Sequence, residues 1–412
     1  MTDPASQHAS LPHAVFLQRM ASGSGQAAFI VLRLVDLLGP EHATLHPDAF
    51  HYQYVATARC CRDLPPGATE TSHLLGLVRS TSDAFRQQST GLVLPALFAY
   101  AHYLEDEMRL EEALDVLETL LHVSGATLAP ADAVGARLRR ARVCRKLNAF
   151  DAAERAYTEG GEMAAAIGDR HSEMLSRLGQ AETLRGRGNL SEAESALREI
   201  LGDAERLGDT NAEAMAHQCI AVVLSTAGRP AEAIPHEWRA FQLYQDELSR
   251  IRTLADLGVM LLTVGDAEGA ERALTQVVLH AGSPEAVNNA LIELMHCASF
   301  RRDRVGFERW RERCDARRDA MPRNVLVDYM LKAGIGRARF GQFDRAERLF
   351  ASALKIADEA GLHEFTFRIE RIRNGLSECQ EICAATPELA TELECHSEAV
   401  REVSASLARL GP

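Results

Sequence analysis

A small residue recurs through most of this chain at spacings of 36 to 40 residues, and this period constrains the fold more than any other feature. The recurring small residues are Ala113, Ala153, Ala193, Ala233, Ala270, Gly306 and Ala346. Four positions later most copies place a larger side chain: Leu117, Tyr157, Leu197, Leu274, Trp310 and Phe350. The fourth copy has Glu237 at that place instead. A period of this length predicts supersecondary units that bury their apolar faces by stacking on one another.

Two further positions mark each copy and predict how it folds. Five positions before the recurring residue most copies have a residue that stops helices: Asn148, Gly188, Gly228, Gly265 and Gly341. Twelve positions before it most copies have another small residue: Ala101, Ala141, Ala181, Ala221, Gly258 and Gly334. Glycine and asparagine adopt the left-handed backbone that ends a helix, and small residues let two helices approach closely. Each copy is therefore predicted to be a helix–turn–helix hairpin.

This pattern resembles the tetratricopeptide repeat (TPR) family over residues 94–362, which hold seven copies. The best single match is in the fifth copy, in the residues Leu257, Gly258, Leu261, Gly265 and Ala270. The copies are longer than the usual repeat of about 34 residues, as in the TPR-like sensor domains of bacterial regulators. The resemblance implies an all-α fold, a right-handed α-solenoid of stacked antiparallel helix hairpins, in which the first helix of each unit lines a concave ligand-binding face. A HEAT-type helical array is the structural alternative, and the glycine-to-alanine spacing argues against it.

Four segments are expected along the chain. They are a disordered N-terminus (1–13), an N-terminal helical region or degenerate repeats (14–93), about seven TPR-like repeats (94–362), and a degenerate eighth repeat with a C-terminal helix (363–412). In the second segment, helix-period apolar residues predict helices at 26–38, 48–64 and 71–88, with a break at 65–69.

The last helix carries apolar residues and one histidine at heptad spacing: Leu389, Leu393, His396, Val400, Val403, Leu407 and Leu410. A solenoid end needs a cover with a polar outer face, so this helix is expected to cap the last repeat. The alternative is a seam for a homodimer, or a helix that transmits a signal to an effector.

Composition argues against several classes of protein. The formal charge of −13 disfavours a general nucleic-acid binder, because a phosphate backbone requires a basic face. The nine cysteines are odd in number and scattered, which disfavours a disulfide scaffold. The sequence shows neither a signal-peptide pattern nor an apolar run long enough to span a bilayer, so a cytoplasmic protein without membrane association is expected.

The first helix of the second copy, GARLRRARVCRK at 135–146, concentrates six basic residues. Together with neighbouring copies, it predicts a ligand-binding set on the concave face: Arg142, Arg145, Lys146, Glu182, Arg185 and His102. The planar fork of arginine matches carboxylate or phosphate, so this face is predicted to bind a peptide terminus, an acidic side chain or a small anionic signal. The alternative is a solvated face whose arginines pair with nearby acids.

Further along the predicted groove, the first helices carry amides, of which Gln218 and Asn288 are the candidate binding residues. Amide side chains offer the donors and acceptors that an extended peptide backbone needs. Ordinary packing between helices is the alternative.

Two other clusters have structural interpretations. Residues 299–323 mix arginines with aromatic rings that would stack on nucleic-acid bases, but Trp310 falls at a core position of the repeat. A candidate metal set lacks the usual ligand spacing and consists of Cys379, Cys383, Cys395 and His396. No nucleic acid, metal or cofactor is therefore expected.

No catalytic signature occurs, so the chain is not expected to be an enzyme. The leading hypothesis is a non-catalytic TPR-type module of a bacterial regulatory or signalling pathway that binds a protein or peptide segment in its concave groove. One alternative is an assembly scaffold without sensing. Another is the sensor portion that controls a separate effector, such as a diguanylate cyclase or a transcription regulator. An unrecognised enzyme would instead require a deep closed pocket with convergent titratable groups.

Overall fold

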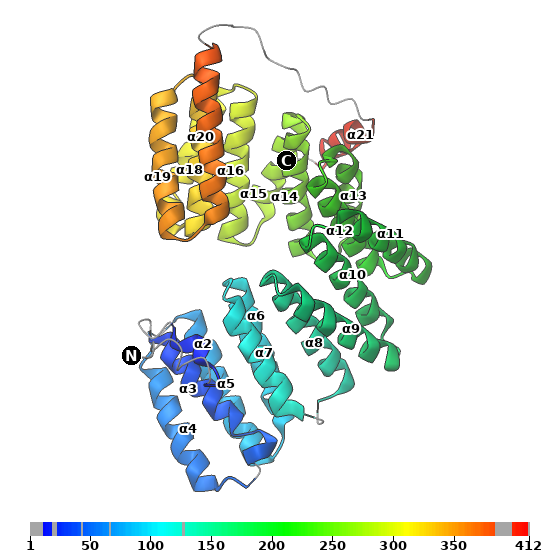
Figure 1. The fold of residues 1–412 in the computed structure, drawn as a ribbon, viewed down its shortest axis with the longest axis vertical. Helices are drawn as coiled ribbons and strands as arrows, with labels where there is room; N and C mark the ends of the chain where they lie inside the picture. The colour runs from blue at the N-terminus through cyan, green and yellow to red at the C-terminus, as the bar shows by residue number, and fades with distance from the viewer. Residues whose placement is uncertain are drawn as a thin grey trace. The chain divides into compact units, whose positions relative to one another are not determined.

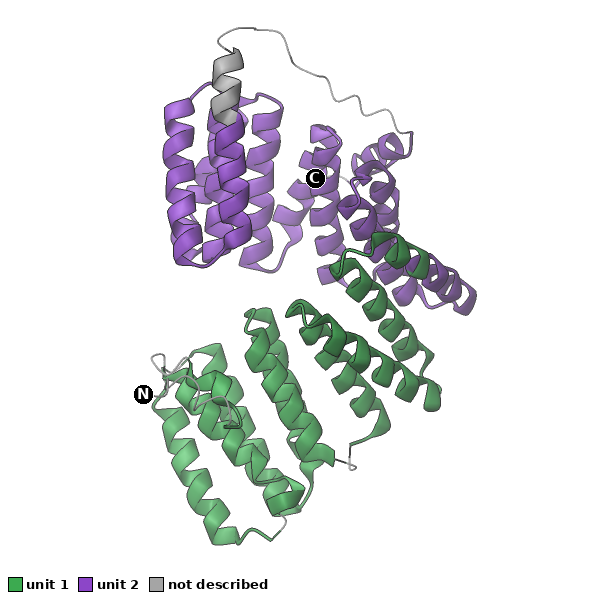
Figure 2. Ribbon diagram, in the orientation of Figure 1, with its two compact units in different colours: residues 1–196 green, residues 197–412 purple. Residues whose placement is uncertain are grey.

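The computed structural model describes residues 11–18, 23–42, 44–65, 67–125, 128–383 and 398–410. Throughout these residues the chain is helical or connects helices, and no strand occurs among them (Figure 1). The expected all-α fold is confirmed. The chain divides into two compact units, residues 1–196 and residues 197–412, which are coloured separately in Figure 2.

The N-terminal region of unit 1 contains α2 (Ala14–Leu17), α3 (Ser24–Asp36), α4 (Pro47–Arg62) and α5 (Thr69–Gln87). The three helices predicted in this region are confirmed as α3, α4 and α5. Their apolar faces join the first hairpins in one core, whose fully buried members include Phe16, Leu32, Leu74, Leu97 and Leu117. This region is therefore continuous with the repeats in its packing.

Within the described residues, seven helix hairpins follow. In unit 1, α6 (Leu94–Asp106) pairs with α7 (Leu110–Ser124), and α8 (Pro130–Lys146) pairs with α9 (Phe150–Ala166). The third hairpin, α10 (Arg170–Gly186) with α11 (Leu190–Leu207), contains the division between the units. The hairpins of unit 2 are α12 (Thr210–Thr226) with α13 (Pro230–Leu243), α14 (Glu247–Thr263) with α15 (Ala267–His280), α16 (Pro284–Phe300) with α17 (Arg304–Asp315), and α18 (Arg323–Arg339) with α19 (Phe343–Glu359).

The turns of five hairpins have the backbone that the sequence predicts. Asn148, Gly188, Gly228, Gly265 and Gly341 all have positive φ, between 58° and 90°. This conformation ends the first helix and reverses the chain within a few residues. The stop residues are therefore confirmed as the left-handed ends of the first helices.

The recurring small residues lie in the second helices at points of close approach. Ala113, Ala153, Ala193, Ala233 and Ala270 are all fully buried, and Ala346 is almost so. The fifth hairpin shows how the small residue of the first helix is used. A β-carbon on Gly258 would lie 2.6 Å from Cγ of Leu274, so only a glycine permits this contact.

The sixth copy is offset by one residue from the predicted register. Its left-handed turn residue is Arg302, with φ of 56°, four rather than five positions before Gly306. The equivalent of Ala270 is therefore Phe307, which is fully buried. Asp303 caps the second helix by accepting a hydrogen bond of 2.9 Å from the N–H of Gly306. The sequence hid this offset because an arginine replaces the usual glycine at the turn.

The C-terminal part of the chain folds onto unit 2. Helix α20 (His363–Cys383) packs against α18 and α19, and the three lie side by side in Figure 1. Helix α21 (Glu398–Leu407) covers other helices, as expected of a cap, but it packs against α13 and α15 rather than on the last repeat. It buries Val400, Val403 and Leu407 there, so its apolar seam is occupied within unit 2. The predicted seam residues Leu389, Leu393 and His396 lie outside the described residues, as do Cys395 and the side chains of Cys379 and Cys383.

Two sequence expectations concern membrane association and the state of the cysteines. None of the described helices is long and apolar enough to cross a membrane. The described residues include six cysteines: Cys60, Cys61, Cys144, Cys219, Cys297 and Cys314. Four of the six are buried, as packed thiols in helical cores commonly are.

Candidate functional site

A basic face in unit 1 is built from the first helices α6, α8 and α10. Its centre is Glu105 of α6, whose side chain is only 1% exposed. Three cations of α8 contact its carboxylate: Arg139 Nε and Arg142 Nε at 2.8 Å each, and Lys146 Nζ at 2.7 Å. Steps of three and four residues place these side chains on one face of α8, which is why a single helix supplies all three.

The charge of Glu105 is held by this cage. Burial opposes its ionisation, but the hydrogen bond from Lys146 and the charges of Arg142 and Arg139 outweigh burial and hold the pKa of Glu105 below its usual range. Arg139 also contacts Nδ1 of His102. Burial and the charge of Arg139 lower the pKa of His102, so its neutral ring accepts this hydrogen bond.

A second carboxylate extends the basic face toward α10. Glu182 lies 2.9 Å from Nη2 of Arg185 and 3.4 Å from Nη1 of Arg145. Among the described residues, Nε of Arg145 has no hydrogen-bond partner although it is buried. The structure therefore brings together six of the eight residues that the sequence singled out: Arg142, Arg145, Lys146, Glu182, Arg185 and His102.

The basic face has more positive than negative charge. Five cations lie on this face: Arg139, Arg142, Arg145, Arg185 and Lys146. They face three carboxylates, those of Glu105, Glu182 and Asp106, and the charge of Asp106 is felt by Arg139 and His102. Among these named side chains, the positive charges outnumber the negative charges by two. Arg142 is 48% exposed, so its guanidinium remains accessible to solvent while it contacts Glu105. This arrangement has the chemistry of an anion-binding surface.

The other two predicted residues belong to unit 2, and both amides bond within the protein. Oε1 of Gln218 accepts a hydrogen bond of 2.8 Å from the hydroxyl of Tyr244. Oδ1 of Asn288 accepts one of 2.6 Å from Nε of Arg317. Asn288 is 3% exposed, whereas Gln218 is half-buried. Only Gln218 therefore has surface available to a ligand.

Unit 2 also contains an acidic groove that the sequence did not reveal. It has a volume of about 330 Å³ and its lining comes mainly from the first helices of the last three hairpins and from α20. The polar lining residues are Asp256, Glu285, Asn289, Glu293, Asn324 and Asp328. Lys332 contacts two of them and lies 2.7 Å from Asp328, so it neutralises only part of their charge. These residues share no motif, and only the stacking of helices brings them together.

A buried acid interrupts the core beside this groove. Glu237 of α13 is fully buried, and within the described chain neither of its carboxylate oxygens has a hydrogen-bond partner. Burial, together with the neighbouring charge of Asp256, raises the pKa of Glu237 well above its usual value. Burial also raises the pKa of Asp256 to about 6. Glu237 is thus a buried acid at the position where most other copies have a large apolar residue.

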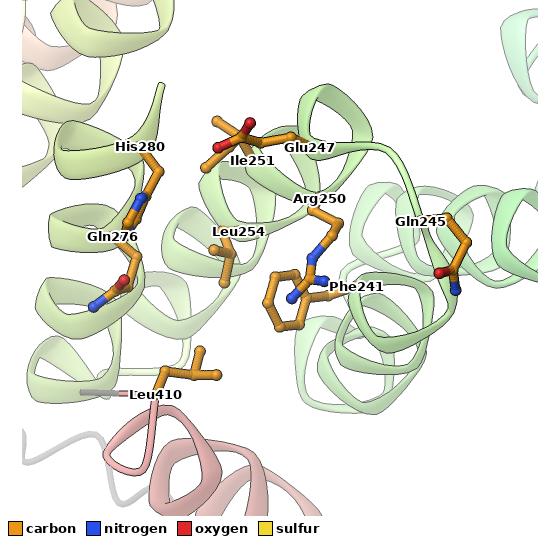
Figure 3. A pocket seen from close by; sticks show the side chains of 9 residues that line it. All are labelled: Phe241, Gln245, Glu247, Arg250, Ile251, Leu254, Gln276, His280 and Leu410. Atoms are coloured by element: carbon orange, nitrogen blue, oxygen red, sulfur yellow. The ribbon is translucent and has the colours of Figure 1, made fainter. Parts of the chain in front are cut away.

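A pocket of about 400 Å³ lies between α13, α14 and α15 (Figure 3). Phe241, Arg250 and His280 line it, and Leu410, which follows α21, closes one side. The guanidinium of Arg250 lies 4.7 Å from the centre of the Phe241 ring, a cation–π contact. The pocket is open to solvent and its cation is already stacked, so it lacks the closed set of convergent groups that an active site needs.

No protein-family model matches the chain, and no curated protein sequence matches it. Solved structures match it in fold. The apo form of the quorum sensor NprR from B. thuringiensis is 11% identical, with a TM-score of 0.55 over 79% of this chain and 97% of that chain. The Rap conjugation gene regulator of plasmid pLS20, in complex with the Phr* peptide, is 10% identical, with a TM-score of 0.52 over 89% of this chain and 98% of that chain.

A third match is a signal transduction ATPase with numerous domains from Pyrococcus horikoshii, which has a tetratricopeptide repeat sensor. It is 12% identical, with a TM-score of 0.50, and covers 84% of this chain but 55% of that chain. Identities this low establish the fold alone. The resemblance to TPR proteins that the repeat predicts is confirmed at that level: the chain has a TPR-like α-solenoid fold.

Proposed function

We propose that this protein is a non-catalytic regulatory module that binds a peptide or protein segment on the first helices of its hairpins. In this proposal the basic face of unit 1 receives an anionic group of the ligand, either an acidic side chain, a C-terminal carboxylate or a small anionic signal. The residues that contact it are Arg142, Arg145, Lys146 and Arg185, while Glu105, Glu182 and His102 hold them in place.

The observation that carries the proposal is the surplus of positive charge on the basic face. A face of arginines that only supported the fold would have its charges balanced by acids. Here Arg139, Arg142 and Lys146 share the single carboxylate of Glu105, and Arg142 remains 48% exposed. An incoming carboxylate would gain charge-assisted hydrogen bonds without having to break the contacts of Glu105.

The fold supports this proposal by analogy. The Rap regulator of similar fold is described in complex with a peptide, and NprR is described as a quorum sensor. A shared fold does not establish a shared function, so these structures support a peptide ligand by analogy alone. The acidic groove of unit 2 suits the opposite chemistry. We assign to it, and to Gln218, whose side chain hydrogen-bonds to the groove residue Asp256, the amide and cationic groups of a peptide, whereas Asn288 positions Arg317.

Selection from a random peptide library displayed on phage, with the full chain as bait, tests this proposal. Acidic residues or a free C-terminal carboxylate should be enriched among the selected peptides. Enrichment of basic peptides alone would assign binding to the acidic groove and remove the basic face from the function. Failure to enrich any peptide over an empty support would contradict peptide binding.

A sensor and an assembly scaffold respond differently to the same ligand. A ligand that binds only the folded state raises the unfolding temperature by mass action, whatever its role. A sensor must in addition change conformation, because an output requires two states that the ligand distinguishes. Small-angle scattering with and without a saturating selected peptide should show altered compactness for a sensor. An unchanged scattering profile would favour the scaffold. A sensor that controls a separate diguanylate cyclase or transcription regulator should also show altered compactness.

A further inference from the structure

Three metal-ligating side chains of unit 2 come together where the end of α11 meets α12, and a fourth lies beside one of them. Glu213 and His217 lie four residues apart on α12, and Glu205 lies near the end of α11. One ligand atom from each of these three lies within 4.8 Å of the others. The fourth side chain, His236 of α13, has its Nδ1 2.8 Å from Nδ1 of His217.

The repeat does not require these residues. The positions equivalent to Glu213 and His217 are Glu173 and Arg177 one copy earlier, and Arg250 and Leu254 one copy later. The position equivalent to His236 is an alanine in both of those copies, Ala196 and Ala273. The fourth copy therefore departs from its neighbours at positions on two helices, and both departures place an imidazole at one point in space.

Two imidazoles that face each other through Nδ1 atoms have two explanations. In one, a single proton lies between them and one ring donates to the other. In the other, both nitrogens direct lone pairs at a cation, which needs neutral rings. The two carboxylates beside the rings favour the second explanation, because a lone hydrogen bond between imidazoles does not need them.

We propose that Glu205, Glu213, His217 and His236 form a binding site for one divalent transition-metal cation of the zinc class. Two imidazole nitrogens and two carboxylate oxygens are a donor set that suits Zn²⁺ or Co²⁺ better than the all-oxygen sets preferred by Mg²⁺ and Ca²⁺. Glu213 and His217, four residues apart on α12, supply two ligands, and α11 and α13 supply Glu205 and His236.

One competing cation is present. Nη2 of Arg239 lies 3.1 Å from Oε1 of Glu213. Arg239 is 51% exposed, so its side chain can leave for solvent at little cost, and the metal replaces its charge beside Glu213. Because the ligands come from three helices, the bound metal would link Glu205 of α11 to the ligands on α12 and α13.

The test uses the full chain, freed of metal with a chelator, and ZnCl₂ or CoCl₂ as the probe. Titration calorimetry of the wild type should show one tight site for Zn²⁺. Affinity should fall at least tenfold in His217→Ala, in His236→Ala and in the conservative variant Glu213→Gln. His280→Ala, which removes a histidine from another surface of the same unit, should bind like the wild type. Circular dichroism checks that each variant is folded.

Cobalt distinguishes this site from the cysteines of the chain. Co²⁺ bound to nitrogen and oxygen ligands gives visible d–d bands without the ultraviolet charge-transfer band of cobalt–thiolate bonds. The wild type should show the d–d bands alone, and His217→Ala should lose them. Equal zinc affinity in wild type and His217→Ala would overturn the proposal, as would a thiolate spectrum or the absence of a tight site.

Discussion

The ring of Phe350 occupies the space that a side chain at Gly334 would need. A β-carbon on Gly334 would lie 2.5 Å from Cε1 of Phe350, which is itself almost fully buried. The two residues lie on the first and second helices of the last hairpin, sixteen positions apart. The same pair, as Gly258 and Leu274, brings α14 and α15 together. The small residues of the repeat thus lie where paired helices approach most closely.

Gly334→Ala is expected to lower the free energy of unfolding by about 1–3 kcal/mol, because the ring of Phe350 has no space to yield. The measurement is urea unfolding followed by circular dichroism. Gly202→Ala is the matched control, since Gly202 lies in helix α11 and nothing lies within 4 Å of the position of its β-carbon. That control should be neutral or stabilising by about 0.5–1 kcal/mol, the gain in helix propensity.

Ala346→Leu tests the register of the second helices. The added atoms overpack a buried contact of α19, so the free energy of unfolding should fall by about 1–3 kcal/mol. Ala351→Leu places the same side chain on the exposed face of the same helix and should change stability by less than about 0.5 kcal/mol. Equal stability of the two variants would show that the register is wrong.

Glu237→Leu is expected to stabilise the protein. The substitution removes a buried carboxyl group that has no hydrogen-bond partner among the described residues, and it restores the apolar side chain that other copies have. The gain should be about 1–3 kcal/mol at neutral pH. Glu232→Leu, an exposed position on the same helix, serves as control and should change stability little. A loss of stability in Glu237→Leu would mean that the carboxyl group has a partner of its own, such as a bound cation.

His13 gives unit 1 a predictable dependence on pH. Its Nδ1 lies 2.5 Å from Asp115 and its Nε2 lies 3.0 Å from Asp36. Burial opposes protonation, but the hydrogen bonds to Asp115 and Asp36 outweigh it and raise the pKa of His13 from 6.5 to about 9. Because the folded pKa is the higher one, the stabilisation is fully present below pH 6.5 and is lost as pH rises toward 9.

Comparison of the wild type with His13→Asn isolates this effect, and asparagine tolerates the left-handed backbone at this position. At pH 6 the wild type should be the more stable by an amount on the order of 3 kcal/mol, and the difference should shrink through pH 9. Urea unfolding at a series of pH values measures it. A difference that stays constant from pH 6 to pH 9 would contradict a protonated His13 between two aspartates.

The repeat predicted most of the fold because each of its positions has a local mechanical cause. Gly265 ends a helix and Ala270 lies where two helices touch. Both roles depend on nearby residues and not on distant parts of the chain. The prediction slipped at Gly306, because Arg302 adopts the left-handed backbone that glycine usually signals. It also misplaced the C-terminal helix, because sequence spacing shows an apolar face without showing which surface receives it.

The candidate sites divide in the same way. The cations around Glu105 were predictable, since helical spacing puts Arg142 and Lys146 on one face. Asn288 was singled out although the groove is lined by its neighbour Asn289, because a shift of one residue turns a helix by more than a quarter of a circle. The cluster of His217 and His236 was not predictable, since its ligands meet only after three helices have packed.

The most direct test of the proposed function compares affinities for one selected acidic peptide, labelled with a fluorophore and measured by polarisation. The double variant Arg142→Ala/Arg145→Ala removes two charges from the basic face. The control Arg137→Ala/Arg140→Ala removes two charges from the same helix, where Arg140 contacts Glu118 of α7 instead. The proposed function predicts at least tenfold weaker binding by the first variant, unchanged binding by the second, and wild-type circular dichroism for both. Equal affinity of the wild type and Arg142→Ala/Arg145→Ala would contradict it.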